Sequence, residues 1–235
     1  MLTLALETSA LSASVAVARE DALLSEITAN HQKNHSLVLM PMVEEALERA
    51  GAVLADLDVI SVSAGPGSFT GVRIGVTTAK SLAHALGVPV SPVSTLAALA
   101  MNAPHAVCPV CPIMDARRGQ VYTALYRVTG FPETLMEPEA LALEEWVMRL
   151  PAGPILFVGD GVPVCRESLR ELMGERALIA PPGAWVQRAS SVARLGLQLY
   201  GAGGSLSYLE ALPIYLRKSQ AQQAYEKRTG ERLDL

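Results

Sequence analysis

The chain has 235 residues, of which 50% are hydrophobic and 18% charged, and its formal net charge is −4. This charge excludes a protein that holds nucleic acid through a global basic surface, so we expect any RNA contact to be indirect or minor. No uninterrupted apolar run approaches the ~20 residues of a membrane span, and the three cysteines suit a reducing, cytoplasmic setting.

Residues 1–103 are expected to form the first of two units. Strands are predicted where apolar runs are bounded by turn residues, over residues 1–6, 13–17, 23–28, 58–63 and 88–93. Helices are predicted where apolar residues recur at helical spacing, over residues 36–50, 72–86 and 95–101. The resulting order, βββαβαβα with a mixed sheet, indicates an α/β layer architecture.

A second unit is expected over residues 104–235. A hairpin is predicted for its start, from residues 107–114 and 120–128, and is followed by a helix ending at Leu150 and a strand over 155–158. The helix near residues 188–203 is expected to join the first unit. The last residues, 220–235, are polar and predict a loose tail.

The most informative segment is glycine-rich and runs from residue 65 to residue 75, GPGSFTGVRIG. It lies between a predicted strand and a predicted helix, where backbone N–H groups at the helix N-terminus favour an anion. Gly65 and Gly67 allow close backbone approach, and Ser68 and Gly71 belong to the same turn. A dinucleotide fingerprint would need glycine at Thr70, and a P-loop would end in Gly-Lys-Ser/Thr. A tight turn that binds nothing is the competing interpretation.

A polar turn, Glu7-Thr8-Ser9, separates the first two predicted strands. Its hydroxyls and backbone can hold an anion while Glu7 positions a hydrated cation, and an ordinary polar hairpin is the alternative. Tyr215 and Arg217 lie in a short segment that slightly favours a partner or nucleic-acid contact. The residues assemble no catalytic triad, and Cys108 and Cys111 are better explained as two buried thiols than as a redox or metal pair.

Several motifs together resemble the TsaB (YeaZ) family. They are LETS at 6–9, SVAV at 14–17, the glycine-rich segment, VSTL at 93–96, DAR at 115–117, VY at 121–122 and PIYLR at 213–217. The resemblance implies an actin-like ASKHA fold with two α/β subdomains, each a mixed sheet flanked by helices, the second of them degenerate. It also implies a noncatalytic partner of TsaD in making threonylcarbamoyladenosine at position 37 of tRNAs that read ANN codons, with TsaE as third component.

The resemblance also bears on the sites. It places Glu7, Thr8, Ser9 and the glycine-rich segment at the phosphate-loop positions of the fold, although many relatives carry Asp where this chain has Glu7. The paralogue TsaD binds a metal through His-x-x-x-His, and Thr95 and Leu99 stand at those positions here. Because neither side chain replaces imidazole, no metal site and no cofactor of the chain's own are expected. ATP or ADP can still bind within the complex.

Two functions therefore compete. In the first, the chain is a scaffold that docks on TsaD through the first-unit helices, and self-associates as a homodimer without TsaD. The candidate interface residues are Leu37, Met40, Val43, Leu47, Val72, Val76 and Lys80. In the second, the chain is an independent nucleotide-dependent enzyme or a peptidase of the glycoprotease-like group, for which the residues supply no evident nucleophile or base.

Overall fold

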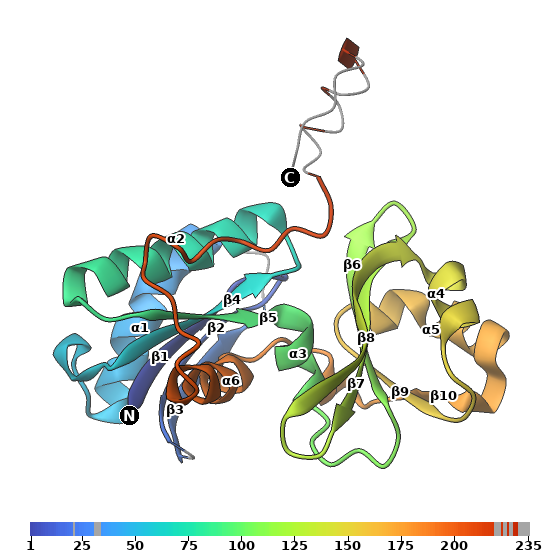
Figure 1. Cartoon of the computed structure of the whole chain (residues 1–235), viewed down its shortest axis with the longest axis horizontal. Coiled ribbons are helices and arrows are strands. Elements are labelled where there is room, and N and C mark those ends of the chain that lie inside the picture. The colour runs from blue at the N-terminus through green and yellow to red at the C-terminus, as the bar shows by residue number, and fades with distance from the viewer. Residues whose placement is uncertain (21, 31–33, 219–221, 223–224, 226–227, 230–235) are drawn as a thin grey trace.

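Two five-stranded mixed sheets, each flanked by helices, lie side by side in the computed structural model (Figure 1). The structure describes residues 1–20, 22–30, 34–218, 222, 225, 228 and 229. The predicted tail, residues 220–235, therefore lies almost wholly outside the described residues. No helix in the part of the chain that the structure describes is long and apolar enough to cross a membrane.

The first sheet and its helices, named lobe I, have the strand order β3-β2-β1-β4-β5. Its strands are β1 (Leu2–Glu7), β2 (Ala13–Arg19), β3 (Ala22–Ala29), β4 (Val59–Gly65) and β5 (Val90–Ser94). Its helices are α1 (His35–Ala50), α2 (Phe69–Leu86), α3 (Thr95–Ala100) and α6 (Ala189–Gly201), with a 3₁₀ turn at Leu54–Asp56. The sequence prediction agrees with the three antiparallel strands β1, β2 and β3 and with the two long helices α1 and α2. It also agrees with α3, which Ser94 caps.

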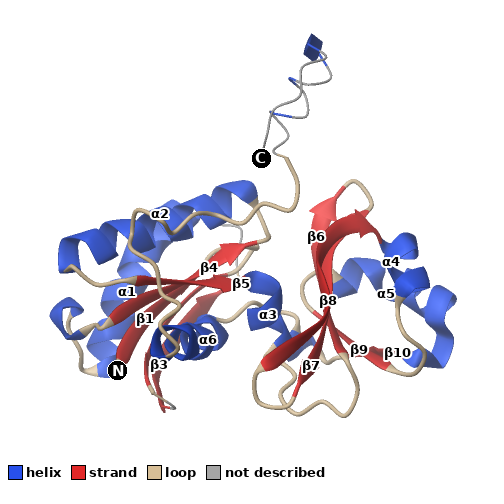
Figure 2. Ribbon diagram, viewed as in Figure 1, coloured by secondary structure: helices blue, strands red, loops and turns tan. Residues whose placement is uncertain are grey.

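The second sheet and its helices, named lobe II, have the order β10-β9-β6-β7-β8. Its strands are β6 (Val110–Arg117), β7 (Gln120–Val128), β8 (Pro132–Ala142), β9 (Ile155–Val158) and β10 (Ala177–Ile179). Its helices are α4 (Leu143–Arg149) and α5 (Val162–Met173), with 3₁₀ turns at Gly174–Arg176 and Pro182–Ala184. Read from β6, the connections repeat those of lobe I with shorter helices, so lobe II is a reduced copy of the same topology (Figure 2).

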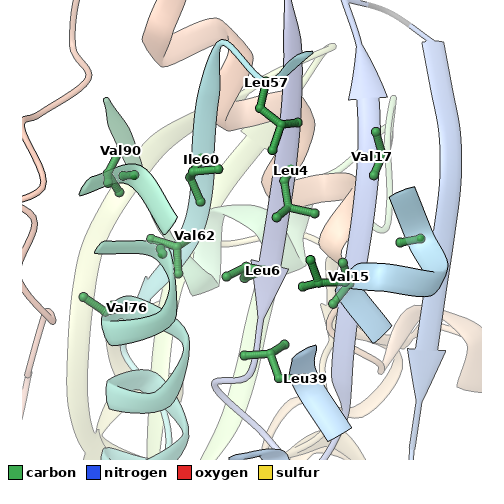
Figure 3. Packing of buried hydrophobic residues seen from close by; sticks show 14 of the residues in the cluster. Leu4, Leu6, Val15, Val17, Leu39, Leu57, Ile60, Val62, Val76 and Val90 are labelled. Carbon is green, nitrogen blue, oxygen red and sulfur yellow. The ribbon is translucent and has the colours of Figure 1, made fainter. Parts of the chain in front are cut away.

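The two faces of the lobe I sheet carry side chains of different size. On β1, Leu4 and Leu6 point toward α1 and α2, where Leu39 and Val76 meet them (Figure 3). Ala5 points the other way, toward α6. Small residues on that face let α6 approach closely, and a Cβ on its Gly196 would overlap Ser61. The alternation along β1 thus places a helix layer on each side of the sheet.

Residues 205–217, which follow α6 and the turn after it, are named the strap. It leaves α6 and crosses lobe I along α2 (Figure 1). Leu206 pairs with Val90 beside β5, Ala211 is fully buried, and the Ile214 N–H donates to the Ala64 carbonyl at 2.7 Å. The sequence-based division, which assigned residues 104–235 to the second unit, is therefore wrong for the strap. Extended segments without periodicity give no local signal of the sheet they join.

Candidate functional site

The glycine-rich turn is filled by the chain itself. A Cβ on Gly67 would overlap the carbonyl oxygen of Ser9, and a Cβ on Gly71 would overlap that of Thr8. The Thr8 hydroxyl donates to the Gly71 carbonyl at 2.8 Å, and the Ser68 N–H donates to the Ser9 carbonyl at 2.7 Å. These glycines allow the β1–β2 turn to pack on the start of α2.

Two further contacts of the turn are also intramolecular. Ser68 is the N-cap of α2, and its Oγ accepts from the Gly71 N–H at 3.3 Å. A Cβ on Gly65, whose φ is +118°, would overlap the Ile214 carbonyl of the strap. Close packing thus explains why glycine stands at positions 65, 67 and 71 without invoking a ligand. The phosphate-loop role stays a prediction.

Glu7 is fully buried where β1 ends. Its Oε1 accepts from the Ser9 N–H at 2.7 Å, whereas Oε2 lacks a hydrogen-bond partner among the described residues. The hydroxyls of Ser9 and Ser12 are buried and unpaired in the same sense. Burial raises the pKa of Glu7, the hydrogen bond from the Ser9 N–H opposes this rise, and nearby Asp160 adds to it.

Asp160 brings a second, half-buried carboxyl to the boundary between the lobes. It follows β9 of lobe II and accepts a hydrogen bond from Gln187 Nε2 at 2.9 Å. Its pKa is raised to about 6, mainly by burial, and the hydrogen bond from Gln187 opposes this rise. Nearby Asp115 adds to the rise, whereas Arg117 reduces it. Glu7 and Asp160 thus bring two carboxyls with raised pKa values close enough to interact electrostatically across the lobe boundary.

Replacement of Asp160 by Asn should change how stability depends on pH. The folded protein binds this proton more tightly than the unfolded chain, so stability falls as pH rises from 3.8 to about 6. Asp160→Asn removes that fall. We expect its free energy of unfolding, minus that of the wild type, to rise by about 2 kcal/mol between about pH 4 and about pH 7.

Urea denaturation at several pH values measures this difference, with Glu133→Gln, an exposed carboxyl of the same lobe, as the baseline variant. Parallel curves for Asp160→Asn and the wild type across this range would show that the folded state does not hold Asp160 protonated.

Thr95 and Leu99, which the resemblance sets against the metal histidines of TsaD, are both buried. Thr95 Oγ1 lies 2.6 Å from Ser63 Oγ, as a paired hydroxyl. Leu99 lies in the core beneath lobe II, where its Cδ2 would be 2.6 Å from a Cβ on Gly159. Within the described residues, no group of three His, Cys, Asp or Glu side chains is placed to hold a metal ion.

A groove of about 530 Å³ lies between α1 and α2 on the outer side of lobe I. Its lining mixes apolar side chains with hydroxyls and one guanidinium, from Ser36, Leu39, Met40, Phe69, Thr70, Arg73, Ile74, Thr77 and Thr78. Leu37 is 74% exposed and Met40 39% exposed on α1. A pair of helices with exposed apolar side chains and a groove between them can receive a partner's helix.

The predicted interface is only partly at the surface. Four of its members lie in the lobe I core and cannot contact a partner, namely Val43, Leu47, Val72 and Val76. Their placement on an interface is wrong because α1 and α2 must each bury one apolar face on their own sheet. Leu37 and Met40 are exposed, and Lys80 Nζ contacts the strap carbonyl of Leu209 at 3.4 Å.

Sequence reasoning missed a stacked cluster beside the groove. The rings of Phe69 and Tyr215 stack with centroids 4.8 Å apart, and the Arg73 guanidinium carbon lies 3.9 Å from the Phe69 centroid. Arg73 Nε also donates to the Tyr215 hydroxyl at 2.8 Å. The chain has only three Phe and six Tyr residues. The available signal was therefore Phe69 and Arg73, which are four residues apart on α2 and lie on the same face of that helix.

Comparison with known proteins places the chain in a family. A family model described as TsaD, tRNA N6-adenosine threonylcarbamoyltransferase, matches residues 22–225. The tRNA threonylcarbamoyladenosine biosynthesis protein TsaB of Bacillus subtilis is 37% identical over 225 residues, which cover 94% of this chain and 96% of the relative. TsaB of Escherichia coli is 29% identical over 199 residues, with 80% and 83% covered.

Solved structures agree with these relatives. YeaZ from Pseudomonas aeruginosa superposes with a TM-score of 0.79 at 30% identity, covering 92% of this chain and 99% of that one. A glucomannokinase from Arthrobacter, with a TM-score of 0.52 at 11% identity and 86% and 99% covered, supports the expected actin-like ASKHA fold alone. The chain belongs to the TsaB (YeaZ) family of tRNA threonylcarbamoyladenosine biosynthesis proteins.

Proposed function

We propose that this chain is a noncatalytic scaffold that activates TsaD in threonylcarbamoylation of adenosine 37 in tRNAs that read ANN codons. The observation that carries the proposal is the groove between α1 and α2, with exposed Leu37 and Met40 at its side. The family model that matches this chain is that of TsaD. A TsaD subunit with the same fold would present two corresponding helices, and the four helices can pack together.

The same argument explains the homodimer expected without TsaD. A second copy of this chain offers an identical helix pair, and a self-complementary surface closes as a twofold dimer. TsaE is the third component in this proposal. Because the net charge is −4, TsaD or TsaE would supply most contacts to tRNA phosphates. ATP or ADP would be held within the complex, and the proposed location is the cytoplasm.

Three features support a noncatalytic role over an independent enzyme. The turn at phosphate-loop positions is packed against the chain itself. Thr95 and Leu99 are a paired hydroxyl and a core side chain. A relative from Pseudomonas aeruginosa is described as similar to a peptidase, but His35 here contacts the Ala10 carbonyl at 2.8 Å, and the His84 ring lies against Tyr208 at a tilt of 45°. Neither arrangement provides a base beside a nucleophile.

Mixing the purified chain with its cognate TsaD tests the proposal. Size-exclusion chromatography with light scattering should show a complex containing both chains, and the homodimer should decline as TsaD is added. The chain alone should show no ATP hydrolysis and no threonylcarbamoyl transfer. Turnover by the isolated chain, or two species that elute independently, would refute the scaffold role.

A further inference from the structure

The two covalent connections between the lobes are tied to each other. The chain enters lobe II through α3 and the residues after it, and returns through the segment before α6 (Figure 1). Asn102, just after α3, donates from its side-chain amide to the carbonyls of Val186 at 2.8 Å and Ala184 at 3.3 Å. Crossing segments joined in this way behave as one hinge.

Near the hinge, the lobes are also joined by apolar contacts of α3 with β6 and β7 and by Arg194 of α6, which lies over the Phe131 ring. A further noncovalent connection lies at the end of the strap. Arg217 Nη1 donates to the Ala116 carbonyl at 2.8 Å and to Gln120 Oε1 at 2.9 Å, on either side of the β6–β7 turn. The guanidinium is partly buried there. Hydrogen bonds from a charged donor to partly buried acceptors are among the stronger ones in proteins.

The strap is fixed firmly to lobe I just before this contact. The Ile214 N–H donates to the Ala64 carbonyl at 2.7 Å, at the end of β4. Tyr215 stacks on Phe69, and its hydroxyl accepts from Arg73 Nε at 2.8 Å. One residue, Leu216, separates Tyr215 from Arg217, which leaves the Arg217 backbone little freedom. Arg217 therefore transmits the position of α2 to the β6–β7 hairpin.

We infer that the strap holds the two lobes in a closed arrangement. Arg217 binds the β6–β7 turn at a distance from the hinge, whose two segments are joined by the hydrogen bonds of Asn102. Loss of the Arg217 hydrogen bonds opens the lobes about the hinge. Phe69 and Arg73, which anchor Tyr215, also line the groove between α1 and α2. The groove is consequently linked to the lobe boundary through Tyr215 and Arg217. The inference rests on intramolecular contacts alone and is independent of the proposed partner.

Distances between spin labels on the two lobes test this inference. Ser81 of α2 and Glu145 of α4 are exposed and accept labels after replacement by Cys. Cys108 and Cys165 are first replaced by Ser, whereas Cys111 is fully buried. The labelled chain is diluted with unlabelled chain, so that distances between molecules do not contribute.

The wild-type background should give one narrow distance distribution. Arg217→Ala should increase the population at longer distances about tenfold or more, because both hydrogen bonds to lobe II are lost. Tyr215→Ala should do the same, although Tyr215 has its contacts on lobe I, because the strap is then free. Arg127→Ala is the matched control: it removes an exposed ion pair with Glu133 within lobe II and should leave the distribution unchanged.

Circular dichroism establishes that each variant is folded. Two variants provide milder changes: Tyr215→Phe removes only the hydrogen bond from Arg73, and Gln120→Ala removes one of the two acceptors of Arg217. Each should give an intermediate population at longer distances. Distributions that match the wild type for both Arg217→Ala and Tyr215→Ala would overturn the inference and leave the strap a passive cover of lobe I.

Discussion

Leu37→Asp should weaken binding to cognate TsaD about 30-fold or more while leaving the free energy of unfolding within about 0.5 kcal/mol of the wild type. Leu37 is 74% exposed on α1, so a carboxylate there meets water in the free chain and apolar surface in the complex. Calorimetric titration measures the affinity and urea denaturation measures the stability.

Two controls make this result specific to the groove. Val164→Asp alters a valine of lobe II that is also 74% exposed, and it should leave the affinity for TsaD unchanged. Val43→Asp places a charge in the lobe I core, where Val43 is 1% exposed, and it should destabilise the fold by more than about 4 kcal/mol. Wild-type affinity for both Leu37→Asp and Met40→Asp would place the docking surface away from α1.

Gly71→Ala should destabilise the protein by about 3 kcal/mol or more, because the added Cβ overlaps the carbonyl of Thr8 and forces β1 and α2 apart. Alanine favours a helix more than glycine does, so the loss cannot come from helix propensity. Gly183→Ala is the matched control, because nothing lies within 4 Å of the added Cβ there. Urea denaturation of both variants provides the comparison.

The phosphate-loop interpretation makes the opposite prediction for Gly71. If the turn cradled a phosphate, Gly71→Ala would lose nucleotide binding and keep most of its stability. Such a result, from calorimetry with ATP and denaturation of the same sample, would contradict a turn built for packing. The experiment thus separates the two meanings that a glycine-rich turn carries in a sequence.

Local pattern predicted most of lobe I and the start of lobe II. Alternation of apolar residues marks the strands in the sequence itself. Glycines mark the ends of the two long helices, Gly51 after α1 and Gly87 after α2, and both have positive φ. Strand β8 was missed because Pro132, Pro138 and several glutamates interrupt its pattern, as suits the edge of a sheet. Helix α5 was missed as well, where Pro163 in its first turn starts the helix.

The candidate site was harder to predict, for a different reason. Helical spacing finds the apolar face of α1, but that face, with Leu39 and Val43, belongs to the core of its own lobe. The informative residue was Leu37, which is apolar yet lies off this face. Spacing along the chain cannot reveal the remaining contacts of the site. Asp160 with Gln187 and Arg217 with Ala116 connect segments that are distant in the sequence, and the contact of Glu7 with Ser9 depends on the burial of Glu7.

Threonylcarbamoyl incorporation into tRNA tests the scaffold role most directly. Cognate TsaD and TsaE would be supplied with threonylcarbamoyl-adenylate synthase, ATP, threonine and bicarbonate, with and without this chain. We expect incorporation only when the chain is present, and none when the chain replaces TsaD. Full incorporation without the chain would contradict its role as the activator of TsaD.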